Sequence, residues 1–278
     1  MQEISFAMKL LEGKKIAEKI LEEVKKEAAG KRLKLVVVLV GEDPASRVFV
    51  KEKEKACKKV SIGFELLTYS ESVSQEELQG KIEEIAKKED VSGIVVQLPL
   101  PKSFSTQEIL DLIPFKKDPD LLSFEGFNNF ASGKIGILPP VVGAVAEILK
   151  EYGFSASGKN VVLVGEGRLV GKPLKVWLER EGADVFLAKE GEKNIPEKVD
   201  FLISGAGKPG LIGKSEDYNI DRETIVIDAG SSLQGRGLVG DIDFKSVSKK
   251  AGFVTPVPGG VGPLTVAVLL GNLVELNK

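Results

Sequence analysis

The sequence contains no histidine and one cysteine, and these two shortages exclude several kinds of site. Without histidine the chain has no Ser-His-Asp triad and no Cys-His pair, and one cysteine forms neither an intrachain disulfide nor a CxxC redox pair. A zinc site made of histidine and cysteine ligands is excluded for the same reason, and we expect no metal. Catalysis must therefore use lysine, carboxylates, tyrosine, serine or a bound cofactor.

Long apolar runs and an excess of one charge are absent as well. The run Leu35–Val40 is far shorter than the ~18 apolar residues that span a bilayer, and the first residues lack the layout of a secretory signal. We therefore expect a cytoplasmic protein that does not act at a membrane. Because 39 Lys and Arg nearly balance 41 Asp and Glu, the chain offers no strong field for a nucleic acid, and we expect no nucleic-acid partner.

What the sequence does contain is an alternation of short β-branched runs with longer stretches of helical period, which is typical of βαβ units. The predicted fold class is α/β, with two βαβ-type domains and a cleft between them, the second domain being Rossmann-like and dinucleotide-binding. A length of 278 residues suits two domains. We place the first at residues 1–139, completed by the C-terminal helix 264–278, and the second at residues 140–263.

The predicted elements follow this alternation. Strands are predicted at Leu33–Val40, Phe64–Leu67, Gly93–Leu98, Asn160–Gly165, Asp184–Ala188, Phe201–Ser204 and Thr224–Asp228. Helices are predicted at Ala45–Val60, Gln75–Lys88, Val142–Tyr152 and Thr265–Leu276. Ser74 followed by Glu77 is typical of a capping box at a helix start, and the prolines and glycines between Pro114 and Pro140 indicate the crossing between the domains.

A glycine-rich turn follows the strand predicted to end at Gly165. Gly165, Gly167 and Gly171 form a GxGxxxG pattern before a helix. Their expected roles are a sharp turn, close approach of the backbone to a pyrophosphate, and tight packing of helix on sheet. The pattern favours a dinucleotide site, and the alternative is a tight turn that binds no ligand.

The end of the next strand bears on which dinucleotide binds. Glu190 stands where a carboxylate would hold the ribose 2′-hydroxyl of NAD, whereas Lys189 and Arg168 are close enough to receive the 2′-phosphate of NADP. The alternative for all three side chains is a solvated loop end.

Lys53 is the candidate base. It shares the less polar face of its predicted helix with Phe49, and neighbouring cations and partial burial both disfavour the ammonium form. Gln97 interrupts an apolar strand, so its buried amide needs partners; its oxygen can accept from a lysine while its nitrogen donates elsewhere. The alternatives are a solvated helix face for the lysine and a backbone cap for the glutamine. Asp118 and Asp120 are candidate ligands in a loop where carboxylates are usually solvated.

The segment Thr255–Thr265 reads TPVPGGVGPLT and resembles TPVPGGVGPMT of the bifunctional methylenetetrahydrofolate dehydrogenase/methenyltetrahydrofolate cyclohydrolases, the FolD family. The other segments that resemble the family, in its order and over nearly the whole chain, are Val40–Ser46, Val96–Pro101, Lys117–Asp120, Gly207–Gly210, Val226–Gly230 and Leu238–Phe244.

This resemblance implies oxidation of 5,10-methylenetetrahydrofolate by NADP or NAD, hydrolysis of the product to 10-formyltetrahydrofolate, and a homodimer. Hydride leaves a carbon flanked by two nitrogens that stabilise the resulting cation, so the first step needs aligned rings more than an acid or base. The second step adds water, and a proton must leave as the C–O bond forms. The alternatives are an enzyme with one of the two activities, or a non-catalytic protein that binds a dinucleotide or a folate.

The resemblance also assigns residues by position. Lys53 matches the family's catalytic lysine, Gln97 its hydrogen-bonding glutamine, and Asp120 the aspartate that holds the pterin. The turn that walls the folate site is matched by Pro258, Gly259 and Gly260. The candidate cofactor-binding residues are Gly165, Glu166, Gly167, Arg168, Gly171, Lys189, Glu190 and Ser231.

The chain departs from the family pattern at several of these positions. Phe49, a candidate substrate-binding residue, replaces a tyrosine; it keeps a ring to stack on the substrate but lacks the hydroxyl, which bears on the hydrolysis step. Leu121 replaces a glycine, and Leu138–Val141 replaces PCTP. Glu166 and Glu190 replace an arginine and a serine. Two carboxylates near a 2′-phosphate should repel it, so we predict that NAD is used at least as well as NADP.

Overall fold

The computed structural model describes residues 8–189, 192, 194–213, 218–235 and 237–278, and its internal contacts divide the chain into two compact units. The Lys53 unit comprises Ala17–Gly143 and Thr265–Lys278, and the Gly165 unit comprises Met1–Ile16 and Ala144–Leu264. The chain passes from one unit to the other within the helices α1 (Gly13–Ala28), α6 (Pro140–Tyr152) and α9 (Val261–Glu275). The boundaries predicted for the functional domains stay a prediction.

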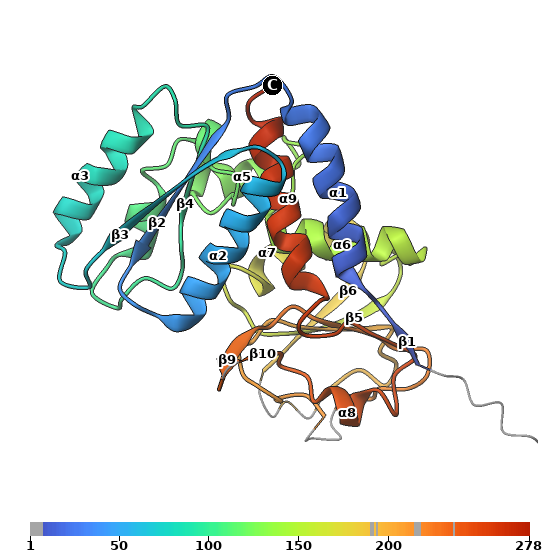
Figure 1. Cartoon of the computed structure of the whole chain (residues 1–278). Coiled ribbons are helices and arrows are strands. Elements are labelled where there is room, and N and C mark those ends of the chain that lie inside the picture. Colours follow the sequence, from blue (N-terminus) through green and yellow to red (C-terminus); the bar gives the residue numbers. More distant parts are fainter. Residues whose placement is uncertain (1–7, 190–191, 193, 214–217, 236) are drawn as a thin grey trace, which may run out of the picture. The chain divides into compact units, whose positions relative to one another are not determined.

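The Lys53 unit is built on a three-stranded parallel sheet in the order β3-β2-β4. Its strands are β2 (Lys34–Val40), β3 (Gly63–Tyr69) and β4 (Gly93–Val96). Successive side chains of β2 enter two different cores. Leu35 and Val37 pack with α1, α2 (Pro44–Lys59) and α9, whereas Val36 and Val38 pack with α3 (Gln75–Ala86) and α4 (Thr106–Leu110). Figure 1 shows α3 on one side of these strands and α2 and α9 on the other. A strand buried on both faces reads as a continuous apolar run, which is why β2 was predictable from the sequence.

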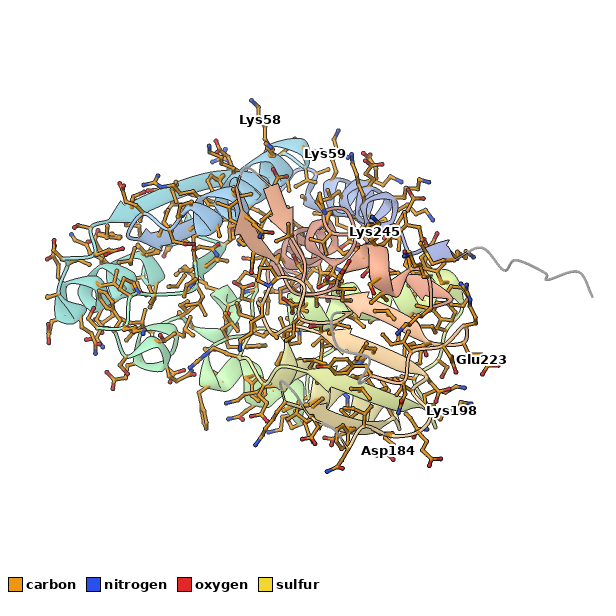
Figure 2. All side chains as sticks on the ribbon, turned by 90° about the horizontal axis from the view of Figure 1, so that it is seen from below. Lys58, Lys59, Asp184, Lys198, Glu223 and Lys245 are labelled. Atoms are coloured by element: carbon orange, nitrogen blue, oxygen red, sulfur yellow. The ribbon has the colours of Figure 1, made fainter. Side chains whose placement is uncertain are left out.

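Three helices of the Lys53 unit, α2, α3 and α5 (Phe124–Ala131), begin at capping side chains. α2 (Pro44–Lys59) begins after Asp43, whose carboxylate accepts a hydrogen bond from the Ser46 backbone N–H at 2.7 Å. At its other end, Lys58 and Lys59 project into solvent (Figure 2). α3 (Gln75–Ala86) begins at Ser74 as predicted, and α4 covers Thr106–Leu110.

The stretch from Pro114 to Pro140, predicted to be the crossing, belongs to the Lys53 unit up to the start of α6 and is not irregular throughout. It contains a 3₁₀ turn at Phe115–Lys117 and the helix α5 (Phe124–Ala131), which Ser123 caps by accepting from the Gly126 N–H at 3.0 Å. The prediction missed α5 because glycine and asparagine are weak helix formers.

The Gly165 unit contains a six-stranded sheet in the order β1-β11-β8-β7-β5-β6, in which the paired strands are parallel. Its strands are β1 (Lys9–Leu10), β5 (Asn160–Val164), β6 (Asp184–Ala188), β7 (Phe201–Ser204), β8 (Ile225–Asp228) and β11 (Phe253–Val254). Figure 2 shows Asp184, Lys198 and Glu223 at the edge where these parallel strands begin. The Gly165 turn lies at the opposite, carboxyl edge.

The remaining elements of this unit are α7 (Gly171–Arg180), the antiparallel pair β9 (Ser232–Gln234) and β10 (Gly237–Val239), and α8 (Phe244–Val247). The hairpin, α1, α8, β1 and β11 lie outside the predicted elements, and β1 joins this sheet although its residues fall in the range predicted for the first domain. The α/β class and the Rossmann-like second sheet are confirmed. None of the helices in the described ranges is long and apolar enough to cross a membrane.

Candidate active site

The centre of the candidate site in the Lys53 unit is a hydrogen bond between Lys53 and Gln97. Lys53 lies on α2, and its Nζ donates to Gln97 Oε1 at 2.9 Å. Gln97 follows β4 and is buried; its Nε2 donates to the Leu98 carbonyl oxygen at 2.9 Å. The two ends of the buried amide are thus satisfied by different partners, and the amide oxygen is aimed at the lysine.

Asp120 is the other charged group of this site. Burial lowers the pKa of Lys53, and the nearby negative charge of Asp120 opposes that change. Burial likewise raises the pKa of Asp120 to about 6, against the effect of Lys53. At neutral pH the site therefore holds an ionised carboxylate beside an amine that loses its proton more easily than an exposed lysine does.

Two further residues share the α2 face of Lys53. Phe49, one turn earlier, is half-buried. Ser46, two turns earlier, is buried, and its Oγ has no hydrogen-bond partner among the described residues. A buried hydroxyl without a partner is a candidate ligand group, which the sequence signals by its spacing of seven from Lys53.

Cys57, one turn after Lys53, has the opposite character. It is buried, and burial raises the pKa of its thiol to about 12. The side chain therefore stays protonated and packs as a small apolar group rather than acting as a nucleophile.

The loop that carries Asp120 is tied to neighbouring elements by its own residues. The Lys117 ammonium donates to the carbonyl oxygens of Ala86 and Lys88 at 2.9 and 2.7 Å, where α3 ends. Asp118 is buried, and its carboxylate accepts from the Ser123 N–H at 2.8 Å, just before α5. Lys117 and Asp118 thus hold the loop, whereas Asp120 interacts electrostatically with Lys53.

The C-terminal helix α9 adds a third tie to this loop. Asn272 is buried, and its Nδ2 donates to the carbonyl oxygens of Pro119 and Leu138 at 2.9 and 2.8 Å. The residue immediately before Asp120 is therefore held by a side chain from the far end of the sequence. The sequence around Asn272 carries no local signal of this role, because both of its partners are backbone atoms.

The glycine-rich turn of the Gly165 unit needs its glycines for different reasons. Gly165 has φ of 103°, and a Cβ there would lie 2.9 Å from the Gly205 carbonyl oxygen. A Cβ on Gly171 would collide with the Gly165 carbonyl oxygen, so close packing requires glycine. Gly167 has no atom within 4 Å of the place a Cβ would take, which leaves open space beside the turn.

The start of α7 has no capping side chain, since Val170 precedes the helix and supplies none. The Lys172 N–H donates to the Gly167 carbonyl oxygen at 3.1 Å and Pro173 has no N–H, so within the first three residues of the helix an anion could use the Gly171 N–H and the positive end of the helix dipole. Such an end attracts an anion, and the glycines allow it to approach. The residues present therefore fit a dinucleotide.

Four of the other predicted cofactor residues follow strands of this sheet, and the fifth is not among the residues that the structure describes. Glu166 is exposed and Arg168 is half-buried, both directly after β5. Lys189 is exposed after β6, and Ser231 is exposed after β8. Glu190 lies outside the described residues.

The turn Pro258–Gly260 also belongs to the Gly165 unit. Gly259 has φ of 108°, and its carbonyl oxygen accepts from the Lys14 N–H at 2.9 Å. A Cβ on Gly260 would lie 2.6 Å from the Pro256 carbonyl oxygen. The structure thus groups Phe49, Lys53, Gln97 and Asp120 in the Lys53 unit, and the turn with the nucleotide residues in the Gly165 unit. Across the described ranges no group of His, Cys, Asp and Glu is arranged to hold a metal ion.

Comparisons with known proteins agree on one family. The family description "Tetrahydrofolate dehydrogenase/cyclohydrolase, catalytic domain" matches residues 11–120, and its "NAD(P)-binding domain" matches residues 139–278. The bifunctional protein FolD of a Nitratiruptor species is 41% identical over 280 residues, which cover 98% of each chain.

Two solved structures extend this likeness to the fold. The bifunctional enzyme FolD of Campylobacter jejuni is 36% identical with a TM-score of 0.89, over 97% of this chain and 98% of that chain. FolD of Trypanosoma brucei, complexed with NADP cofactor and inhibitor, is 30% identical with a TM-score of 0.88, over 97% of each chain. This chain belongs to the tetrahydrofolate dehydrogenase/cyclohydrolase (FolD) family.

Proposed function

We infer that this chain is a bifunctional enzyme of one-carbon metabolism that oxidises 5,10-methylenetetrahydrofolate to 5,10-methenyltetrahydrofolate and hydrolyses that product to 10-formyltetrahydrofolate. The observation that carries this conclusion is the Lys53–Gln97 hydrogen bond beside Asp120, in a chain that belongs to the FolD family. A protein that only bound folate would have no use for a half-buried amine whose pKa is lowered.

In the oxidation, the chain binds and aligns the reactants. A bound NADP or NAD would supply the acceptor for the hydride of the one-carbon bridge. Gly165, Gly167 and the start of α7 would hold its pyrophosphate. Asp120 accepts two parallel hydrogen bonds from the amino-pyrimidine edge of the pterin, which fixes the ring and hence the carbon that reacts. Phe49 stacks on the substrate, and the role predicted for the turn Pro258–Gly260 in folate binding stays a prediction.

In the hydrolysis, Lys53 acts as the base. Its neutral amine takes a proton from the water that adds to the methenyl carbon, and the lowered pKa makes that neutral form accessible. The bond from that carbon to N5 then breaks as the formyl C=O forms, and N5 takes up a proton. Gln97 fixes the position of Nζ through its amide oxygen. Because Phe49 has no hydroxyl, no phenol assists this proton transfer from its position on α2.

The direct test is an assay of the purified protein with each substrate. The reduced cofactor that forms from methylenetetrahydrofolate reports the oxidation, and the decay of methenyl absorbance reports the hydrolysis. We expect both activities. A protein that performs one of them alone would be a single-activity member of the family, and one that performs neither would contradict the proposal.

We also propose that NAD is used at least as well as NADP. A family member binds NADP, but here Glu166 replaces the family's arginine and is exposed beside the turn, where its charge repels a 2′-phosphate. We expect kcat/KM with NAD to equal or exceed that with NADP. The matched variant Glu166→Arg should raise kcat/KM for NADP about tenfold and leave NAD nearly unchanged, since one charge-assisted contact is gained. A strong NADP preference in the unaltered protein would contradict this prediction.

Asn272 should matter for folate binding because it holds the Asp120 loop. Asn272→Leu removes both donors, and we expect the KM for folate substrate to rise about tenfold in both reactions. Asn277→Leu is the matched control, since Asn277 follows the same helix and donates to the carbonyl oxygens of Ser92 and Leu273 at 3.0 and 2.8 Å. Both variants should lose similar thermal stability. Equal KM values in the two variants would show that Asn272 has no special role in placing Asp120.

The assembly and the functional domains remain proposals of the same kind. We propose a homodimer, to be tested by sedimentation of the full chain. We propose further that residues 1–139 with 264–278 serve the folate and residues 140–263 serve the dinucleotide.

A further inference from the structure

The Gly165 unit contains a pair of buried carboxylates that the proposed chemistry does not use. Asp228 ends β8 and Asp241 follows β10, and both side chains are buried. A buried carboxylate is costly unless it is well hydrogen-bonded, so the groups it holds indicate its purpose. Neither residue was predicted from the sequence to belong to the site.

Asp241 holds the loop that follows β7. Its carboxylate accepts hydrogen bonds from the backbone N–H groups of Ala206, Gly207 and Lys208 at 2.7, 3.1 and 2.8 Å. It also accepts from the Ser204 hydroxyl at 2.8 Å. The hydrogen bonds from Ser204, Ala206 and Gly207 converge on Oδ2, and the bond from Lys208 reaches Oδ1, so both oxygens of Asp241 bind groups within the protein. Three successive N–H groups directed at one side chain determine the path of this loop.

The loop at residues 205–208 packs directly against the Gly165 turn. A Cβ on Gly165 would lie 2.9 Å from the Gly205 carbonyl oxygen and 3.0 Å from the Ala206 nitrogen. A Cβ on Gly205 would collide with the side chain of Val170, the residue before α7. The loop therefore has no room to shift without moving the turn, and closely packed groups transmit such a shift.

Asp241 is itself held by groups at the end of β8, a third strand of this sheet. Its backbone N–H donates to Asp228 Oδ1 at 3.2 Å, and the Gly230 N–H donates to the same oxygen at 3.0 Å. A Cβ on Gly230 would collide with the Asp241 carboxylate. The Ser232 hydroxyl donates to the Gly207 carbonyl oxygen at 3.1 Å. Asp241 thus joins the segments that follow β7 and β8 beside the Gly165 turn.

We propose that Asp241 is a positioning residue of the dinucleotide site, which acts by holding the 205–208 loop against the Gly165 turn. The inference rests on the proposed function, because it requires a dinucleotide at that turn. Asp241 sets the affinity for the cofactor and leaves the hydrolysis unaffected, since the addition of water to the methenyl carbon consumes no dinucleotide.

The test is Asp241→Asn, which keeps the size of the side chain but turns an amide group toward the loop N–H donors. We expect the KM for NADP and for NAD to rise about 10- to 100-fold, the loss typical of a hydrogen-bonded charge. Hydrolysis of methenyltetrahydrofolate by the same protein should stay within about twofold, because the catalytic lysine and its partners are untouched. Calorimetric titration with NADP should show the same loss of affinity. A merely structural defect would lower both activities together.

Two further variants complete the experiment. Asp200→Asn is the matched control, because Asp200 lies just before β7, at the opposite edge, and accepts from the Asn160 N–H at 2.9 Å; NADP binding should not change. Gly230→Ala keeps the Asp241 charge but displaces its carboxylate, and it should also raise the KM for NADP. It carries the test if Asp241→Asn does not fold.

Unchanged NADP affinity in Asp241→Asn and Gly230→Ala, or an equal loss of hydrolysis, would overturn the role of Asp241. An unaltered protein without dehydrogenase activity would instead overturn the proposed function.

Discussion

Replacement of Lys53 by methionine should abolish hydrolysis of 5,10-methenyltetrahydrofolate and leave measurable hydride transfer. Methionine keeps much of the length of lysine but removes the amine that takes the proton from water. Loss of a general base slows a reaction about 10²- to 10⁴-fold. Hydride transfer needs aligned rings rather than a base, so the dehydrogenase should retain the larger share of its rate. Separate assays of methenyl decay and of reduced cofactor measure the two effects.

The pH profile and a matched variant sharpen this test. The neutral amine is the active form, so hydrolysis should increase as the pH rises through the lowered pKa of Lys53, and this increase should vanish in Lys53→Met. Lys58→Met removes a lysine from the same helix that projects into solvent (Figure 2), and we expect no change. Hydrolysis that survives in Lys53→Met, or that falls equally in Lys58→Met, would show that another group is the base.

The strands near the site were predictable because burial on both faces determines their residue types. β2 and β5 are buried on both faces, so their sequences are continuous apolar runs, and the predicted ranges agree with the structure to about one residue. The sequence left Gln97 with two alternatives, a lysine partner or a backbone cap at the strand end, because a buried polar side chain must find a partner. The structure shows both, since the amide oxygen accepts from Lys53 and the amide nitrogen donates to the Leu98 carbonyl oxygen.

The supporting contacts of the site were not predictable from the sequence. Asn272 donates to a carbonyl oxygen 153 residues away in the chain, and Asp241 binds backbone groups of a loop more than thirty residues earlier. Backbone atoms exist at every position, so no residue type signals such a partner. α5 was missed for a related reason, since its start depends on the Ser123 cap rather than on strong helix formers.

Leu121 shows how the chain tolerates a departure from the family pattern. The position that the family fills with glycine has φ of 55° here, in the left-handed region where side chains are unfavourable by about 1–2 kcal/mol. The Leu121 side chain is fully buried, and burial of a leucine is favourable by about 1.5–3 kcal/mol. The apolar contacts therefore offset the backbone strain, and the loop that carries Asp120 keeps a glycine-like turn.

Replacement of Asp120 by asparagine should impair both reactions, because both use the same bound pterin. Loss of a carboxylate that accepts two hydrogen bonds should lower kcat/KM about 10²-fold, mainly through the KM for folate. In the unaltered protein, folate binding should weaken as the pH falls through about 6, where burial places the pKa of Asp120. That pH dependence should be absent from Asp120→Asn. Steady-state rates with both folate substrates between pH 5 and 8, roughly the span that brackets this pKa, measure it.

The same substitution should raise the melting temperature. The folded state binds the Asp120 proton more tightly than the unfolded chain, whose ordinary pKa is 3.8, so the free energy of unfolding falls as the pH rises from 3.8 to about 6. At neutral pH the ionised carboxylate is therefore destabilising, and asparagine removes that charge. Asp90→Asn should instead lower the melting temperature slightly, because the hydrogen bond from Lys34 lowers the pKa of Asp90 in the folded state. An Asp120→Asn protein that melts at a lower temperature than the unaltered chain would show that this carboxylate stabilises the fold. A variant that melts at a higher temperature but is inactive would show that the Asp120 charge serves substrate binding at a cost in stability.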